Sequence, residues 1–229
     1  MVYVISDLHG YPLEKFQQLL ERASFGEEDV CYVLGDVIDR GAHGIALLRW
    51  ILRHPRMRLI CGNHEAMMLA VRFVVENEDC REYPIKIDNA LRRWLANGGT
   101  PTLDALCSLP HSQATALLDA VEAAPLYAEV EAAGRRYLLT HSGLMHFHPD
   151  KPLEKYYRPE LLWNRPCLEQ EYYSDKVVVF GHTPTMLLDP ACCGRVLFTP
   201  TWIDIDTGAA MGWEPTLLCL DTMEEYRLL

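Results

Sequence analysis

Short apolar runs rich in β-branched residues recur along the first third of the chain, and each ends in a cluster of small polar residues. Runs of this length between turn residues are typical of buried strands. Each run is followed by apolar residues at helical spacing, which indicates an amphipathic helix. The pattern therefore predicts alternating strands and helices, as in an α/β protein. The predicted strands are Val2–Ser6, Val30–Leu34 and Arg58–Cys61, and the predicted helices are Leu13–Leu20, Ile45–Leu52 and Met67–Val75.

The second half of the chain has a different pattern. Residues 88–124 have helical spacing, with breaks at Asn97-Gly98-Gly99 and near Pro110. Strand-like runs then return without helical segments between them, so part of the sheet structure should be antiparallel or mixed. No repeat, low-complexity tract or linker interrupts the sequence, and we predict one mixed α/β (α+β) domain over residues 1–229. The late strands are expected at Tyr137–Thr140, Lys176–Phe180, Trp202–Asp206, Leu217–Leu220 and Tyr226–Leu229.

Composition and charge narrow the classes of function. The 229 residues are 49% hydrophobic, which is enough to fill a core at this length. The formal charge of −11 opposes binding of a polyanion, so nucleic acid is not expected as a partner. The eight cysteines form no Cys-x-x-Cys pair and several lie in apolar runs, which predicts buried thiols in a reducing compartment. We expect neither a secretion signal nor a membrane-spanning segment, and hence a cytoplasmic protein.

Polar side chains of metal-binding type collect where the predicted strands end. Loops at the carboxyl ends of strands build the sites of α/β folds, so five separate loops should converge on one pocket. A mixture of carboxylate, amide and imidazole ligands suits Mn²⁺, Fe or Zn²⁺ rather than Ca²⁺. One carboxylate between two groups of ligands can bridge two ions, and we expect two divalent cations, with Mn²⁺ preferred. The residues are Asp7, His9, Asp36, Asp39, Asn63, His64, His141 and His182.

Two of these clusters are specific in sequence. The segment 35–41, Gly-Asp-Val-Ile-Asp-Arg-Gly, fixes five residues, and at roughly 5–7% usage each it arises by chance about once per million start points. Gly62-Asn63-His64-Glu65 adds four residues in order. Any one cluster could be a simple turn with Asp or Asn as a helix cap. Together they favour a catalytic metal site.

With Asp7-x-His9, these clusters resemble the signature of the phosphoprotein phosphatase family, within the calcineurin-like metallophosphoesterases. The likeness is greatest to the bacterial branch that includes the phage lambda phosphatase. It implies a central pair of mixed β-sheets sandwiched between helices. Segments farther along the chain also resemble such proteins: Trp94 with Asn97-Gly98-Gly99, His141-Ser142-Gly143, Leu162–Arg165, Val178–Pro184 and Ile205–Ala209.

The resemblance also implies roles for single residues. Asp7 and His9 hold the first metal, Asp36 bridges, and Asn63, His141 and His182 hold the second. His64 is the proton donor with Asp39 as its partner, and Arg40 and Arg165 bind the substrate phosphate. The sequence departs from the family at Cys61, where an arginine is usual, so a phosphate-facing guanidinium is expected to be missing there.

The expected reaction is hydrolysis of phosphate monoesters by hydroxide activated between the two cations. Phosphoserine and phosphothreonine of proteins or peptides are the expected substrates, with phosphotyrosine and small phosphomonoesters also accepted. One alternative is a symmetrical dinucleoside tetraphosphate hydrolase, which should need more basic residues near the motifs. The other is a metal-free binding or scaffold protein, which the complete ligand set disfavours. We expect Asp206 to be a turn residue beside the site, and His146 and His148 to lie on the surface.

Overall fold

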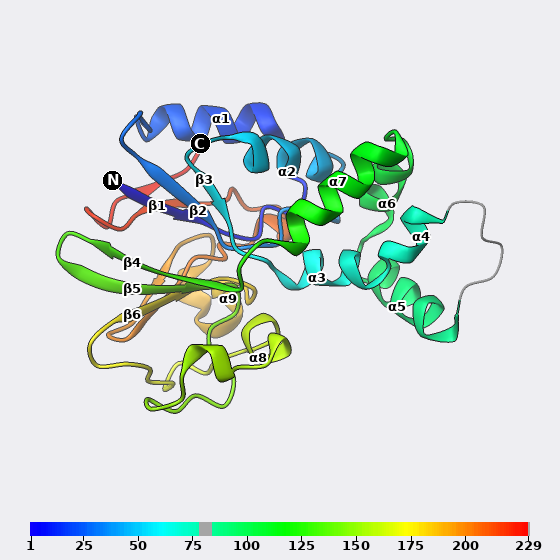
Figure 1. Ribbon diagram of the computed structural model, residues 1–229. Helices are drawn as coiled ribbons and strands as arrows, with labels where there is room; N and C mark the ends of the chain where they lie inside the picture. The colour runs from blue at the N-terminus through cyan, green and yellow to red at the C-terminus, as the bar shows by residue number, and fades with distance from the viewer. Residues whose placement is uncertain (78–83, 229) are drawn as a thin grey trace.

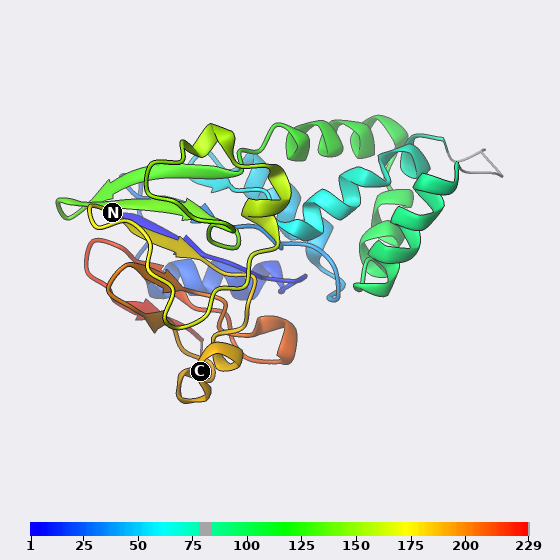
Figure 2. The same cartoon turned by 90° about the horizontal axis from the view of Figure 1, so that it is seen from below.

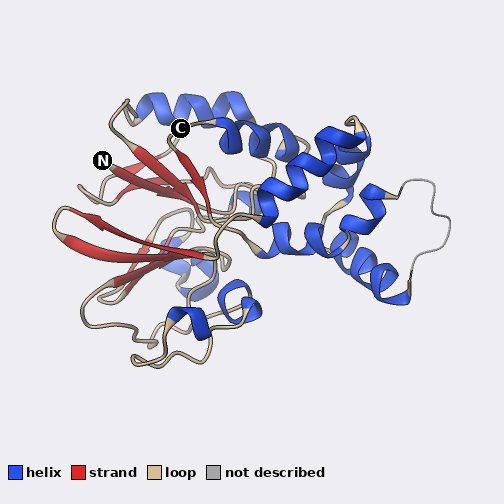
Figure 3. Ribbon diagram, in the orientation of Figure 1, coloured by secondary structure: helices blue, strands red, loops and turns tan. Residues whose placement is uncertain are grey.

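The computed structural model describes residues 1–77 and 84–228 and places their strands in two five-stranded sheets (Figures 1 and 3). The first sheet has the order β10-β9-β1-β2-β3. Strands β1, β2 and β3 run parallel to one another. Strand β9 runs antiparallel to β1, and β10 runs antiparallel to β9. The bounds are β1 Val2–Ile5, β2 Val30–Val33, β3 Met57–Leu59, β9 Leu217–Cys219 and β10 Glu225–Tyr226.

The second sheet has the order β4-β5-β6-β8-β7, with β5, β6 and β8 parallel and an antiparallel strand at each edge. The prediction of mixed sheets is therefore confirmed. The edge strands β4 and β7 were not predicted. The last strand was predicted at Tyr226–Leu229, but strand pairing ends at Tyr226, and Leu229 lies outside the described residues. The bounds are β4 Tyr127–Ala132, β5 Arg135–Thr140, β6 Val177–Phe180, β7 Leu197–Phe198 and β8 Trp202–Asp204.

A buried apolar layer joins the two sheets face to face. Val4 and Leu218 from the first sheet pack in one cluster with Leu139, Val179 and Ile203 from the second. Each such side chain contributes roughly 1.5–3 kcal/mol by its removal from water. This layer fixes the strand ends of one sheet beside those of the other.

Helices cover the outer face of the first sheet. In Figure 1, α1 (Leu13–Arg22) and α2 (Gly44–Arg53) lie across it. α1 buries Phe16, Leu19 and Leu20 at the helical spacing read from the sequence. The outer face of the second sheet instead packs against the largely irregular segment 144–173, which contains α8 (Arg158–Leu162). Short turns of helix complete the chain at α9 (Thr185–Leu188), Leu153–Lys155, Pro190–Cys192 and Ala209–Met211.

A helical lobe extends from one end of the sheets, as Figures 1 and 2 show from two sides. The single helix predicted at Met67–Val75 is two helices, because the chain turns at Val71. The helical region with breaks at residues 97–99 and 110 is confirmed. Among the described residues, no helix is long and apolar enough to cross a membrane. The helices are α3 Asn63–Ala70, α4 Arg72–Glu76, α5 Ile85–Ala96, α6 Thr100–Cys107 and α7 His111–Glu122.

Candidate metal centre and catalytic site

The candidate site forms where the carboxyl ends of strands from both sheets meet. Asp7 follows β1 of the first sheet, and His182 follows β6 of the second. The His182 backbone N–H donates to Asp7 Oδ2 over 2.8 Å. A Cβ atom on Gly181 would collide with the same carboxylate, so only glycine allows this approach. The site is therefore shared between the two sheets.

The backbone of the site is held in an unusual conformation. Six of the predicted site residues have positive φ, between 42° and 72°, although none is glycine. Such conformations are costly and persist where the surrounding structure imposes them. Here the loops bond one another: the His9 N–H donates to Asp36 O over 2.9 Å, and the Asp7 N–H to Gly35 O over 3.1 Å. The six are Asp7, His9, Asp36, Asp39, Arg40 and His182.

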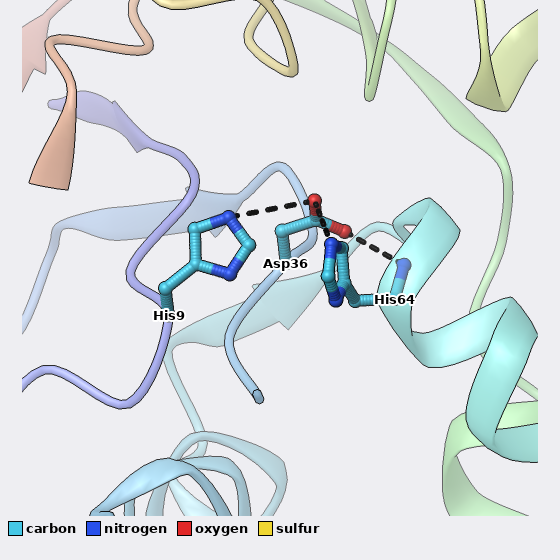
Figure 4. A group of neighbouring side chains, drawn as sticks. All are labelled: His9, Asp36 and His64. Atoms are coloured by element: carbon cyan, nitrogen blue, oxygen red, sulfur yellow. Dashed lines mark hydrogen bonds and ion pairs between the residues drawn. The ribbon is translucent and has the colours of Figure 1, made fainter. Parts of the chain in front are cut away.

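Asp36 lies at the centre of the cluster. Its carboxylate is 3.8 Å from His9 Nε2, 3.9 Å from His64 Nε2 and 3.5 Å from His141 Nε2, and Figure 4 shows it between the rings of His9 and His64. Within residues 1–77 and 84–228, two groups of side chains have ligand atoms close enough to hold a cation: His9, Asp36 and His64, and Asp36, His141 and His182. Asp36 belongs to both groups, as a bridging ligand would.

The remaining expected ligands adjoin these groups. Asp7 Oδ1 is 3.8 Å from His9 Nε2, and Asn63 Oδ1 is 2.7 Å from His141 Nε2. His64, for which we expected no ligand role, is close enough to Asp36 to enter the first group. The geometry therefore permits His64 as a ligand or as an acid.

Hydrogen bonds to the histidine rings test whether a cation fits. Nδ1 of His9 lies 3.2 Å from the Ile38 carbonyl oxygen, and Nδ1 of His141 lies 2.7 Å from that of Leu34. Because a carbonyl only accepts, Nδ1 donates in both rings, and Nε2 of the neutral ring is an acceptor. Nε2 of His182 is buried without a hydrogen-bond partner in the described part of the chain. His182 Nε2 thus has no donor among these residues, and Nε2 of His141 faces another acceptor, Oδ1 of Asn63. Buried acceptors in this arrangement suit a divalent cation.

The electrostatics of the cluster agree with this fit. Burial lowers the pKa of His9 well below its usual range and the pKa of His182 to about 2, so both rings are neutral, as metal ligands must be. Burial also raises the pKa of Asp36 well above its usual range, opposed by His64 and reinforced by Asp7. Burial and the nearby Asp7 carboxylate thus oppose ionisation of Asp36, and the positive charge of a bound cation would favour the ionised form.

His64 and Asp39 form a buried pair beside the metal-ligand cluster. The two side chains lie 2.6 Å apart, from Nδ1 to Oδ2. Burial lowers the pKa of His64, but the Asp36 charge and the hydrogen bond to Asp39 outweigh it, so the net pKa is raised. The guanidinium of Arg40 lies 3.1 Å from His9 Nε2 and 3.3 Å from His64 Nε2. The imidazole of His64 thus contacts both the Asp39 carboxylate and the Arg40 guanidinium.

A pocket of about 310 Å³ opens onto these groups. Eight of the ten predicted site residues line it, and the other two, His141 and Asp39, contact lining residues from behind. Asp206 also lines the pocket, as expected for a turn residue beside the site. His146 and His148 lie outside it and are exposed, as predicted. The eight are Asp7, His9, Asp36, Arg40, Asn63, His64, Arg165 and His182.

Two residues that support the site received no role from the sequence. The carboxylate of Glu65 is fully buried and accepts the backbone N–H groups of Asp36, Val37 and Gly62 over 2.8 to 3.0 Å. It therefore ties the loop after β2 to the start of α3. Trp163 lines the pocket wall, with its ring centroid 5.8 Å from that of His182. Glu65 lies in the Gly62–Glu65 motif and Trp163 in the Leu162–Arg165 segment, both of which indicated the site. The spacing of a motif does not show what each of its side chains contacts.

This fold and site define a metallophosphoesterase, a class that hydrolyses phosphate esters with divalent metals. Residues 1–186 match the sequence model of the calcineurin-like phosphoesterases, and the chain belongs to that family.

The relatives divide between two kinds of substrate. Serine/threonine-protein phosphatase 2 of Salmonella typhimurium is 27% identical over 91% of this chain and 87% of its own length. The symmetrical bis(5'-nucleosyl)-tetraphosphatase of Chromobacterium violaceum is 36% identical, but over 31% of this chain and 26% of its own length. Among solved structures, a candidate diadenosine tetraphosphatase superposes with a TM-score of 0.67 at 19% identity, over 99% of this chain and 92% of that one. A yeast serine/threonine phosphatase similar to human PP5 gives a TM-score of 0.55 at 15% identity, over all of this chain and 80% of that one.

Proposed function

We propose that this protein hydrolyses phosphate monoesters, with phosphoserine and phosphothreonine in proteins as its main substrates and phosphotyrosine also accepted. The observation that carries the proposal is the His64–Asp39 pair, which lies with Arg40 beside the Asp36 cluster. A proton donor, a phosphate-binding cation and a set of metal ligands are the parts that phosphoryl transfer to water requires.

The metal ligands are assigned by position. Asp7, His9 and Asp36 would hold one cation, and Asp36, Asn63, His141 and His182 the other. When bound, such cations supply a water of lowered pKa and positive charge beside the phosphoryl oxygens. Mn²⁺ is the preferred ion, because mixed carboxylate, amide and imidazole sites suit it.

The other side chains act on the substrate directly. The planar guanidinium groups of Arg40 and Arg165 bind the phosphoryl oxygens and orient phosphorus for in-line attack. His64 donates a proton from Nε2 to the departing oxygen. Asp39 accepts from Nδ1 of the same ring, so it keeps Nε2 directed at the pocket and favours the protonated ring.

A groove beside the pocket supports an extended substrate. It encloses about 600 Å³ between α3 and α5, and Trp163 borders both the groove and the pocket. Its lining includes the apolar side chains of Met67 and Ala70, while Lys86 and Arg93 add positive charge. A peptide segment that flanks the phosphorylated residue fits such a surface, since apolar and acidic side chains would both find partners.

Hydrolysis of symmetrical dinucleoside tetraphosphates is the second candidate. It is supported by the local identity with the bacterial tetraphosphatase and by the superposition on the candidate diadenosine tetraphosphatase. Against it, the similarity to the protein phosphatase extends over most of both chains. The pocket offers two arginines, which is few for a chain of four phosphates.

A substrate panel tests the proposal. The protein is treated with a chelator, reloaded with Mn²⁺, and assayed on phosphoserine, phosphothreonine and phosphotyrosine peptides and on diadenosine tetraphosphate. We expect the highest kcat/KM on the phosphoserine and phosphothreonine peptides. A higher value for diadenosine tetraphosphate, with ADP as the product, would establish the second candidate instead. If neither the phosphopeptides nor diadenosine tetraphosphate were hydrolysed, the result would favour the third hypothesis, a binding protein without catalytic activity.

A further inference from the structure

The loop that carries Asp39 and Arg40 is bonded from outside by the helical lobe. Both residues have positive φ, 72° and 64°. The Asp39 N–H donates to Thr102 Oγ1 over 2.9 Å, and the Arg40 N–H donates to the Gly98 carbonyl oxygen over 2.8 Å. Because these two donors are satisfied by the α5–α6 junction, that junction holds the costly conformation of the loop.

The Asp39 carboxylate has an uneven set of partners. Oδ2 accepts the Nδ1–H of His64 over 2.6 Å and the indole Nε1–H of Trp94 over 2.7 Å. Oδ1 is buried and has no hydrogen-bond partner within the described ranges. Trp94 and Asp39 are both 0% exposed. The indole is therefore the second group that fixes which oxygen faces the imidazole, and the described part of the chain offers this carboxylate no third hydrogen-bond donor.

The indole is itself held by close packing at the end of α5. A Cβ atom on Gly99 would lie 2.7 Å from Trp94 Nε1, and a Cβ atom on Gly98 would lie 2.8 Å from Arg40 Cγ. Gly98 also has a φ of 97°, which a side chain would oppose. These two glycines let the ring and the loop approach so closely that the Trp94 side chain has little freedom to rotate.

We infer that Trp94 is a positioning residue that acts through Asp39 on the imidazole of His64. The inference rests on the proposed function, in which His64 protonates the leaving oxygen. Without the indole donor, the buried carboxylate keeps one partner and can rotate between its two oxygens. The imidazole then loses its fixed direction, and proton donation depends steeply on direction.

The chemistry of the leaving group separates this role from simple support of the fold. A serine alkoxide is a poor leaving group and needs the proton from His64 as it departs. A p-nitrophenolate ion departs without one. Misplacing the imidazole should therefore slow hydrolysis of a phosphoserine peptide far more than hydrolysis of p-nitrophenyl phosphate.

Trp94→Phe is the test variant, because it keeps an aromatic ring and removes the N–H. With Mn²⁺, we expect kcat on the phosphoserine peptide to fall by about 10-fold or more, part of the 10²–10⁴-fold that general acids contribute. On p-nitrophenyl phosphate the loss should stay below about 3-fold. The ratio of the two losses does not depend on the fraction of folded enzyme. Equal losses on both substrates would overturn the inference.

Trp202→Phe is the matched control. Trp202 is also 0% exposed, and its Nε1–H donates to the Gln170 carbonyl oxygen over the same 2.7 Å, but it lies away from the pocket. We expect Trp202→Phe to lower the melting temperature. It should leave unchanged the ratio of kcat on the phosphoserine peptide to kcat on p-nitrophenyl phosphate. A shift of that ratio as large as in Trp94→Phe would show a general effect of losing a buried indole, and would contradict the inference.

A ring-proton measurement separates this inference from the proposed function. In protein labelled with ¹⁵N-histidine, the Nδ1–H resonance of His64, assigned by its absence in His64→Asn, should shift or broaden in Trp94→Phe and stay in place in Trp202→Phe. An unchanged resonance in Trp94→Phe would refute the positioning role, whatever the substrate. If wild-type protein failed on both phosphomonoesters, the proposed function would fail, and the resonance would still decide on Trp94.

Discussion

The guanidinium of Arg158 donates a hydrogen bond from Nη2 to Sγ of Cys61 over 3.0 Å. Cys61 occupies the position where an arginine is usual in the phosphoprotein phosphatases that this sequence resembles. Its side chain is 0% exposed and does not line the pocket. Burial raises the pKa of its thiol to about 12, so the group that Arg158 meets is neutral. The Cys61 side chain therefore packs against Arg158 and does not line the pocket.

Cys61→Arg should accordingly destabilise the protein rather than tighten phosphate binding. A longer side chain would overpack a buried position, at a cost of about 1–3 kcal/mol, and would place a second guanidinium beside Arg158. We expect the melting temperature to fall by several degrees, and more than in Cys61→Ala. A variant of wild-type stability with a lower inhibition constant for inorganic phosphate would show that position 61 does reach the pocket.

Asp36→Asn should weaken both cation sites at once, because Asp36 belongs to both ligand groups. After incubation with Mn²⁺ and gel filtration, we expect bound metal measured by mass spectrometry to fall from about two ions per chain to below one. His182→Asn should remove mainly one ion, since His182 belongs to one group. Retention of both ions in Asp36→Asn would exclude a bridging role.

His64→Asn tests proton donation against metal ligation. We expect kcat on phosphoserine peptides to fall by about 10²–10⁴-fold with metal content nearly unchanged. The distance of 3.9 Å from His64 Nε2 to Asp36 Oδ2 makes the metal measurement decisive. Loss of one ion in this variant would make His64 a ligand.

Charge reversal in the groove tests the peptide substrate. Lys86 and Arg93 line it, and no ion pair within the described residues engages either one. In Lys86→Glu/Arg93→Glu, KM should rise about three- to five-fold for phosphopeptides with acidic flanks and fall for those with basic flanks. Arg92→Glu is the control: Arg92 is on the same helix but pairs with Asp88 outside the groove. Identical KM values for both peptides in all variants would remove the groove from substrate binding.

Glu160 gives a prediction for acid stability. The Glu160 carboxylate accepts hydrogen bonds from Lys151 and from the Tyr157 backbone N–H. These two bonds lower the pKa of Glu160 from 4.5 to about 2. A lowered pKa means that the stabilisation is present above the ordinary value and is lost as pH falls from about 4.5 toward 2. The difference in unfolding free energy between wild type and Glu160→Gln, measured in urea, should therefore shrink between pH 5 and pH 3. A difference that grew on acidification would contradict this assignment.

The sequence predicted the mixed α/β architecture, and it predicted that the candidate site residues lie together at strand ends. Residues such as Asp7 and Asp36 follow apolar runs directly, so strand-end chemistry identified them. β4 was missed because it is the outer strand of a hairpin, where Glu129 and Glu131 break the apolar pattern. The contact between Trp94 and Asp39 joins positions 55 residues apart, and helical spacing shows only that a tryptophan faces a core.

The division of the site between two sheets has a consequence during synthesis. A nascent chain that has emerged as far as α7 already contains Asp7, Asp36 and Asn63, but it lacks His141 and His182. Such a chain lacks two of the side chains that the proposed second cation site needs. The proposed site can therefore form only when strands β5 and β6 of the second sheet are in place.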